Sequence, residues 1–295
     1  MIKLAMLGIL FCHVAAAADP SEGLVRSDTL TARIPPRPEH ALTGSEFIDY
    51  VSHMDPQHRE RAIRNEIFKG NLPDFLRKLV PVELRYRSPG KGVMTATIFV
   101  MPDYLAIGSN DDCLRIPMNF YSALAIATHF GFVLPTKKMV DAIYAQSAHH
   151  LAPQPLPAGP RMRSSEYYRF HNQLIERQAR DLGIRPGDLV SGDKKDVVIT
   201  NRLIQHMGRI AIYGWHRPNG IPIQPLSTVH GAGYADYSHG IRLISDVVLV
   251  GGRIRSVYDV LGDSGQANLL SGEGPINQLF WSHLPGDPGG SDAIQ

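Results

Sequence analysis

A β-hairpin is predicted at residues 82–101, which read VELRYRSPGKGVMTATIFVM. Apolar and polar side chains alternate on both sides of residues 88–92, and a period of two is typical of strands with one buried face. Residues 88–92 contain proline and glycine, which favour a turn. A second hairpin is predicted at 247–250 and 253–257, around a Gly-Gly pair. The sequence therefore predicts a mostly antiparallel β core.

Helices are predicted before and between these hairpins. Asp55 is followed by proline, an N-cap with Pro at the first helical position, and Asn119 and Thr136 each precede an amphipathic run. A long helix is expected at 165–182, and a third strand at 104–108. The expected class is α+β, with a helical N-terminal block and a mostly antiparallel β core in the C-terminal half.

Composition excludes several classes of protein. The chain has 295 residues, of which 43% are hydrophobic and 20% charged, as in a globular protein rather than a disordered or coiled-coil one. The net charge is only +2, so no basic field favours nucleic acid as a partner. Beyond the first 18 residues no apolar run is long enough to span a bilayer, so stable membrane insertion is not expected.

The first 18 residues predict a signal peptide. Lys3 is a positive n-region, residues 4–14 are an apolar h-region, and four alanines at 15–18 fit cleavage after Ala18. The expected location is therefore secreted or periplasmic. Cleavage would leave Cys113 as the one cysteine, so no internal disulfide is expected.

Composition divides the chain into six expected segments. They are a signal peptide at 1–18, a linker or arm at 19–42, an N-terminal helical and β region at 43–150, a Pro-rich connector at 151–164, a catalytic region at 165–284 and a flexible tail at 285–295.

Reactive side chains are densest at 213–217 and 229–242, in Gly-rich sequence between expected core strands. Function often lies on loops that a rigid scaffold positions. The candidate catalytic residues are His216, His230, Asp236, His239 and Arg242, supported by Ser238 and Tyr234; the candidate substrate-binding residues are Trp215, Tyr237 and Arg202. The sequence predicts that these residues share one site.

Three chemistries could use this set. In one, His216, His230, Asp236 and His239 bind a divalent metal such as zinc, which activates a water molecule while Arg242 steadies the oxyanion. In another, a histidine is the general base, Asp236 orients it, and Ser238 or water is the nucleophile.

The third chemistry is β-elimination on a uronate, in which Tyr234 or Tyr237 acts with His239 and Arg242. The competing interpretation of the whole cluster is structural: the same groups could be hydrogen-bonded members of a polar loop.

A family resemblance is carried by His230-Gly231 and by Ser-His-Gly-Ile-Arg-Leu at 238–243. These residues resemble the signature of the L,D-transpeptidase (YkuD-like) catalytic domain, in which a His-Gly precedes Ser-His-Gly-Cys, an aliphatic residue and Arg. The resemblance implies that His239 is the base, Arg242 the site arginine and His230 an oxyanion-side group.

The family's nucleophilic cysteine is missing from this sequence, between Gly240 and Ile241. Cys113 is not expected to replace it, because the carboxylates of Asp111 and Asp112 beside it disfavour the thiolate.

The leading hypothesis is a secreted or periplasmic hydrolase that acts on an amide, ester or glycosidic bond of a polar envelope or extracellular polymer. The alternatives are a polysaccharide lyase that uses Tyr, His and Arg, and a non-catalytic protein that binds carbohydrate or envelope through Trp215 and the tyrosines. The expected partner is a polymeric or small polar substrate, with one zinc ion as the cofactor of the metal version.

Overall fold

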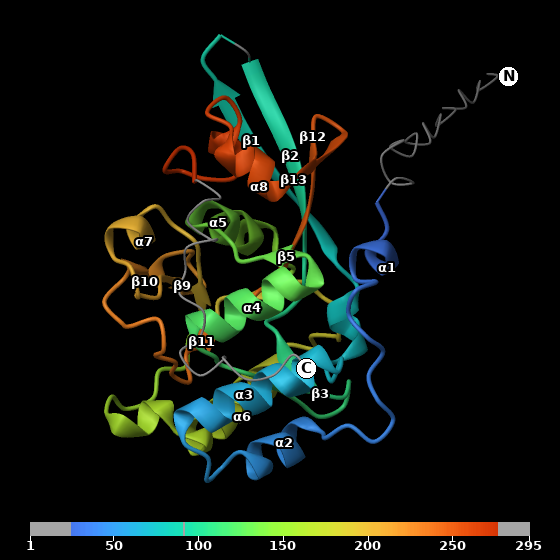
Figure 1. Ribbon diagram of the computed structural model, residues 1–295, viewed down its shortest axis with the longest axis vertical. Coiled ribbons are helices and arrows are strands. Elements are labelled where there is room, and N and C mark those ends of the chain that lie inside the picture. The colour runs from blue at the N-terminus through green and yellow to red at the C-terminus, as the bar shows by residue number, and fades with distance from the viewer. Residues whose placement is uncertain (1–24, 91, 277–295) are drawn as a thin grey trace, which may run out of the picture.

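The computed structural model describes residues 25–90 and 92–276, and it confirms the α+β class. The expected signal peptide at 1–18 and tail at 285–295 lie outside the described residues. In Figure 1, helices α2, α3 and α6 lie at one end of the molecule and the long β1–β2 hairpin with α8 at the other, while α4 and α5 lie between them.

The described helices are α1 (Ser27–Leu30), α2 (Gly44–Tyr50), α3 (Pro56–Phe68), α4 (Phe120–Phe130), α5 (Lys137–Gln146), α6 (Ser165–Asp181), α7 (Arg202–Gln205) and α8 (Val257–Gly262). The described strands are β1 (Val80–Ser88), β2 (Gly92–Val100), β3 (Ala106–Gly108), β4 (Cys113–Arg115), β5 (Phe132–Val133), β6 (His149–His150), β7 (Val190–Ser191), β8 (Lys195–Val197), β9 (Ile212–His216), β10 (Pro222–Ser227), β11 (His239–Gly240), β12 (Ile244–Val250) and β13 (Arg253–Ser256).

Side-chain caps begin the principal helices as the sequence predicts. The Asp55 carboxylate accepts hydrogen bonds from the first backbone N–H groups of α3, and Asn119 and Thr136 do the same for α4 and α5. Helix α4 ends at Gly131, which has a φ of 78° and so takes the left-handed conformation that glycine adopts without strain. Ser164 caps α6.

Both predicted hairpins are present, and they belong to one sheet. Strands β1 and β2 pair antiparallel, as do β12 and β13, and β12 also pairs with β2 and β5. Ile98 on β2 faces Val248 on β12, 150 positions later in the chain. The mostly antiparallel β core is therefore confirmed, and its main sheet joins the predicted hairpins from both halves of the chain.

The strand expected at 104–108 forms away from this sheet. Its C-terminal part is β3, which pairs antiparallel with β4 as a separate ribbon. A second sheet has the order β10-β9-β8-β11. Its strand β11 runs parallel to β8, with His239 opposite Lys195 and Gly240 opposite Asp196. This pairing places the candidate loop directly against residues 193–196.

One main hydrophobic cluster runs from Ile34 to Ile276 and includes residues from both sides of the Pro-rich connector. The part of the expected arm that is described, residues 25–42, packs on this core: Ile34 is buried, and Arg37 donates to Asn71 Oδ1 at 3.0 Å. It is therefore an integral part of the fold rather than a linker.

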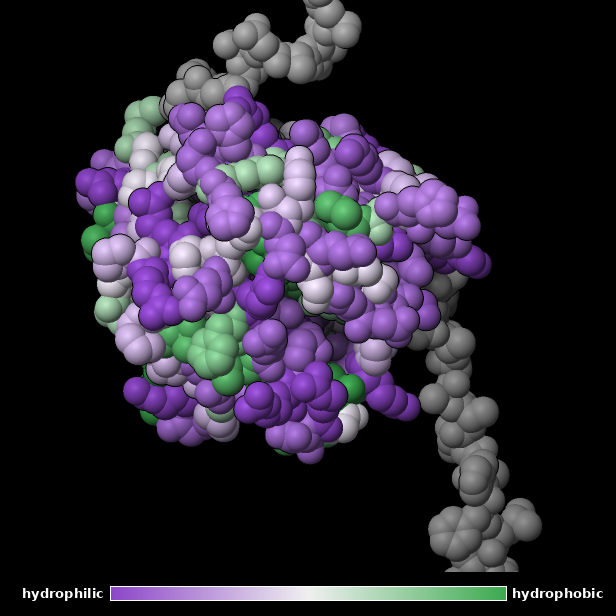
Figure 2. Space-filling model, turned by 90° about the horizontal axis from the view of Figure 1, so that it is seen from below, coloured by the Kyte–Doolittle hydropathy of each residue, from purple (hydrophilic) through white to green (hydrophobic). Residues whose placement is uncertain are grey.

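The face seen in Figure 2 is predominantly hydrophilic and is interrupted by small hydrophobic patches. Within residues 25–90 and 92–276, no helix has the length and apolar character that crossing a membrane requires.

Candidate functional site

Trp215 sets the direction of the side chains around the site. It is the one non-glycine residue with a positive φ, 55°, in the part of the chain that the structure describes. Bulky residues rarely adopt this region, and strained backbone is often found at functional sites. The ring of Tyr213 packs on that of His216 at 5.6 Å, whereas Trp215 packs on Tyr237 at 6.3 Å. The distorted strand β9 therefore presents Tyr213 and His216 on one side and Trp215 on the other.

Asp236, Ser238 and His239 lie together on the Trp215 side, and all three are buried. Asp236 Oδ1 accepts hydrogen bonds from Ser238 Oγ at 2.5 Å and from Ser238 N at 2.8 Å. Asp236 Oδ2 lies 4.0 Å from His239 Nε2. Since Ser238 donates to the carboxylate, the predicted triad in which histidine activates the serine is not the observed arrangement.

His239 has no hydrogen-bond partner on either ring nitrogen among the described residues. Burial lowers the pKa of His239 to about 4, against the opposing attraction of Asp236, so the imidazole is neutral at pH 7. Burial by itself would raise the pKa of Asp236, but His239 and the bond from Ser238 lower it on balance. The site therefore pairs a neutral base with a carboxylate.

Tyr234 connects this buried pair to the surface. Its hydroxyl donates to Asp236 Oδ2 at 3.1 Å, and its ring lies 5.7 Å from that of His239. The Tyr234 ring also stacks on that of His230 at 4.1 Å, and both residues are half-buried. Burial, and then Asp236, raise the pKa of Tyr234 to about 12, so the phenol keeps its proton. His230 and Tyr234 thus form an outer layer over Asp236 and His239.

Behind the pair lies a layer of aromatic and basic groups. Lys194 is 1% exposed and donates from Nζ to the Tyr237 carbonyl at 2.7 Å, and burial lowers the pKa of Lys194 to about 7. The Lys195 ammonium lies 5.0 Å from the centre of the Trp215 ring. Trp215 Nε1 and both ring nitrogens of His171 are buried without partners among the described residues. So many unpaired buried polar atoms are unusual in a purely structural core.

Sequence reasoning missed His171 and underestimated Lys194. His171 lies on the amphipathic helix α6, where one polar residue on a helix gives no sign that its ring faces Tyr237 at 4.9 Å. A Lys-Lys pair before a strand is typical of a solvated turn, and only the parallel pairing of β8 with β11 buries Lys194.

The role expected for Arg242 is not supported. Its guanidinium is 1% exposed and donates to the Met101 carbonyl at 2.9 Å and the Val190 carbonyl at 2.7 Å. It also lies 4.3 Å from the ring centre of Tyr104, whose hydroxyl donates to Asp196 at 3.0 Å. Arg242 therefore ties three segments together within the core and does not face a substrate.

His216 lies apart from the other candidate residues. It stacks on Tyr144 at 4.5 Å, with its Nε2 3.5 Å from Asp141, on the opposite side of β9 from Trp215. The four proposed zinc ligands are thus not gathered, and the described residues contain no group of three or more His, Cys, Asp or Glu placed to share a metal ion. The donor set does not fit zinc.

The remaining candidates are also separated. Tyr237 is in the buried layer, where its hydroxyl accepts from Leu156 N at 2.7 Å, so the Pro-rich connector packs against the site. Arg202 lines a pocket on the Tyr213 side of β9. Cys113 is on β4, and burial raises the pKa of its thiol to about 12, which disfavours a thiolate nucleophile.

Comparisons of the chain with protein-family models, curated proteins and solved structures found no significant match. The resemblance of 230–231 and 238–243 to the L,D-transpeptidase signature therefore stays a prediction. What the structure adds is the placement of these residues: Asp236 and His239 are paired beneath Tyr234, and Arg242 serves the core.

Proposed function

We propose that this chain is a secreted or periplasmic hydrolase whose acid–base centre is His239 with Asp236. One observation carries the proposal: a fully buried imidazole, with no hydrogen-bond partner within residues 25–90 and 92–276, lies 4.0 Å from a carboxylate and directly beneath a half-buried Tyr–His pair. A strained backbone at Trp215 and the buried ammonium of Lys194 beside the pair support it.

The chemistry is the addition of water to an acyl carbon. His239 removes a proton from a water molecule as the oxygen attacks, and the resulting imidazolium returns that proton to the leaving nitrogen or oxygen when the scissile bond breaks. Asp236 stabilises the transient imidazolium across 4.0 Å. Tyr234, which keeps its proton, is the hydrogen-bond donor for the carbonyl oxygen as negative charge develops there.

Access to His239 requires the outer layer to move. His239 is 0% exposed, whereas His230 and Tyr234 are half-buried and held to each other by stacking. Rotation of the Tyr234 side chain breaks one hydrogen bond, to Asp236, and uncovers the imidazole. The proposed resting state is therefore closed, and substrate binding opens it.

The proposed substrate is an amide- or ester-linked polymer of the cell envelope. Export by the predicted signal peptide would bring the protein to such polymers, and the basic side chain of Arg163 lies against the Tyr234 ring. The L,D-transpeptidase resemblance favours a peptide cross-link. Without the family's cysteine, the acceptor is water rather than a second peptide.

The test is to incubate purified protein with isolated peptidoglycan and with ester-linked envelope polysaccharide, and to identify the released fragments by mass spectrometry. We expect fragments that carry one oxygen from ¹⁸O-labelled water. His239→Gln should slow their release at least about a hundredfold, and His206→Gln, which changes an exposed histidine, should not. Unchanged release by His239→Gln would refute the proposed centre.

A polysaccharide lyase is the second candidate, because the side chain of an arginine, Arg163, lies against the ring of Tyr234. Arg163 is positioned 5.3 Å from the ring centre of Tyr234 and is exposed, so it could neutralise a uronate where Arg242 cannot. Unsaturated uronate products absorb ultraviolet light, because their new double bond is conjugated with the carboxylate, and ¹⁸O would not enter them. The same incubation therefore distinguishes the two reactions.

The third candidate, a non-catalytic binding protein, is favoured by the complete burial of His239 and Asp236. It predicts that no polymer is cleaved and that His239→Gln weakens polymer binding only modestly. A pull-down with insoluble peptidoglycan measures that binding without turnover.

A further inference from the structure

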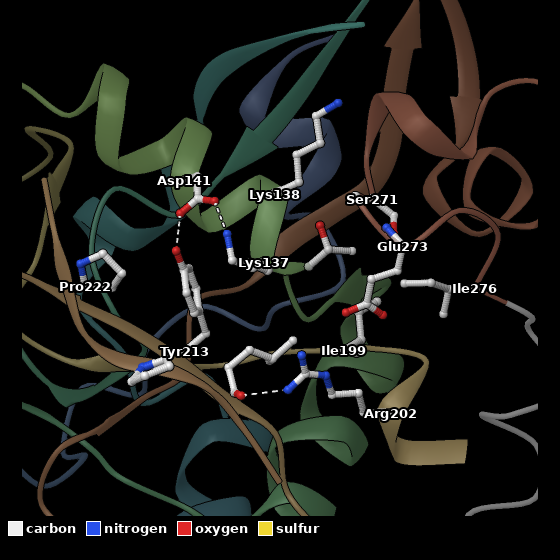
Figure 3. A pocket seen from close by; sticks show the side chains of 14 residues that line it. Lys137, Lys138, Asp141, Ile199, Arg202, Tyr213, Pro222, Ser271, Glu273 and Ile276 are labelled. Carbon is white, nitrogen blue, oxygen red and sulfur yellow. Dashed lines mark hydrogen bonds and ion pairs between the residues drawn. The ribbon is translucent and has the colours of Figure 1, made fainter. Parts of the chain in front are cut away.

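A pocket of about 850 Å³ lies on the side of β9 that faces away from His239. Its walls come from four parts of the chain: the first turns of α5, residues 199–202, strands β9 and β10, and residues 271–276. Figure 3 shows Lys137, Asp141 and Tyr213 grouped on one side of it, with Arg202 and Glu273 on the other. The volume suits a small organic ligand.

The two carboxylates of the pocket already have partners. Asp141 accepts from Tyr213 Oη at 2.6 Å and from Lys137 Nζ at 2.8 Å. Glu273 accepts from Thr200 Oγ1 at 2.7 Å and from the backbone N–H of Asn201 at 2.8 Å. Their charges are therefore engaged in holding the walls together.

The positive charges of the basic side chains in the pocket are less fully paired with carboxylates. Arg202 is exposed and donates one guanidinium nitrogen to the Leu226 carbonyl at 2.9 Å, and no carboxylate of the described residues lies within ion-pair distance of it. Lys138 donates to the Asn268 carbonyl, a neutral acceptor. With Lys137 paired to Asp141, the pocket retains positive charge that a bound anion would balance.

The apolar part of the lining lies beside Arg202. Ile199 and Ile276 are buried residues whose side chains reach the pocket, and Leu226, the residue that Arg202 touches, is half-buried. A ligand that covers this apolar lining and also pairs with Arg202 needs an apolar body next to a negatively charged group. Glu273 on the same wall disfavours a dianion, because a second negative charge would be repelled.

We propose that this pocket binds a small organic monocarboxylate with an apolar body, with its carboxylate on Arg202. The planar guanidinium offers two parallel N–H donors to a carboxylate, a geometry that an ammonium cannot reproduce. The apolar body then covers Ile199, Leu226 and Ile276. Because the pocket and the His239 centre lie on opposite sides of β9, this proposal does not depend on the proposed hydrolase.

The test is isothermal titration calorimetry of the full chain at pH 7.5 with 4-phenylbutyrate. Two control ligands separate the contributions: 4-phenylbutyramide keeps the apolar body without the charge, and acetate keeps the charge without the body. We expect one phenylbutyrate per chain and at least about tenfold weaker binding of each control ligand. Equal binding of the amide, or no saturable phenylbutyrate binding up to about 10 mM, would overturn the proposal.

Arginine variants locate the site. Arg202→Gln should weaken phenylbutyrate binding at least about tenfold, and Arg202→Lys should lie between it and the unchanged chain. Arg209→Gln is the matched control, since Arg209 is also exposed and also donates to a backbone carbonyl, that of Val229, but does not line the pocket. Equal affinity of the Arg202→Gln and Arg209→Gln variants would place the carboxylate elsewhere and overturn the proposal.

Discussion

Gly240 lies flat against the ring of Tyr104, without room for a side chain. A Cβ at Gly240 would come within 2.6 Å of two Tyr104 ring carbons and 2.7 Å of Lys194 Cβ. The glycine of the Ser-His-Gly run therefore allows β11 to pack tightly on the segment that carries Lys194. This contact, rather than backbone flexibility, explains why glycine is needed at this position.

Gly240→Ala should consequently destabilise the protein by about 1–3 kcal/mol, because the added methyl group overpacks a rigid contact. Gly233→Ala is the matched control in the same loop, since a Cβ there would meet nothing within 4 Å. Urea denaturation of the two variants gives the difference. Equal stabilities would show that Tyr104 moves aside at no cost.

Arg242→Lys should lower the free energy of unfolding by about 3 kcal/mol. An ammonium cannot reach the Met101 and Val190 carbonyls together and also cover the Tyr104 ring. The proposed turnover per folded molecule should change little, because Arg242 does not face the His239 centre. A loss of turnover in variant protein that melts normally would instead restore Arg242 to the site.

His239 and Asp236 should act as one unit. We expect His239→Gln and Asp236→Asn each to reduce kcat/KM by about 10²–10⁴. The double variant should be only slightly less active than the less active of the two single variants. Initial rates on a released-fragment assay measure this. Effects that add in free energy would mean that the two side chains contribute independently.

Acid should destabilise the fold through His239. The pKa of His239 is about 4 in the folded chain and about 6.5 when unfolded, so the unfolded state binds more protons between these values. The free energy of unfolding should therefore fall as the pH falls from about 6.5 to about 4.

Substitution by glutamine, which does not titrate, isolates this contribution from those of Asp236 and Lys195 nearby. The stability advantage of the unchanged chain over His239→Gln should shrink by at least about 1 kcal/mol across that window. Urea titrations at several pH values provide the measurement. A constant difference would show that the imidazole is not buried in its neutral form.

Cys113→Ser should leave activity within about threefold, because a thiol with a pKa of about 12 supplies no thiolate at neutral pH. The complementary measurement is the released-fragment assay after treatment of the unchanged protein with a maleimide, which alkylates thiols. Rapid inactivation by stoichiometric labelling of Cys113 would contradict this and revive a thiol mechanism.

The local structure was largely predictable from the sequence. Asp55, Asn119 and Thr136 cap helices because their short side chains accept bonds from nearby N–H groups, and the alternation around residues 88–92 needs only the neighbouring residues to form a hairpin. The pairing of β2 with β12 was not predictable in this way, since no local pattern specifies which distant edge a hairpin will meet.

The candidate site could be predicted in part, where its residues are close to one another in the chain. Asp236, Ser238 and His239 are neighbours in the chain and stay together in the fold. His216 does not join them, because Gly214 and Trp215 both have a positive φ and turn His216 to the other side of β9. No sequence period reveals such a local distortion. His171 joins only through tertiary packing.

The pairing of β2 with β12 also bears on how the chain is made and moved. Until residue 250 has left the ribosome, β2 has only β1 as a neighbour and its other edge is unpaired, so a nascent chain cannot complete its main sheet. The main sheet therefore closes only after residue 250 has been synthesised. For the proposed export through a translocation channel, which requires an extended chain, this delay would be an advantage.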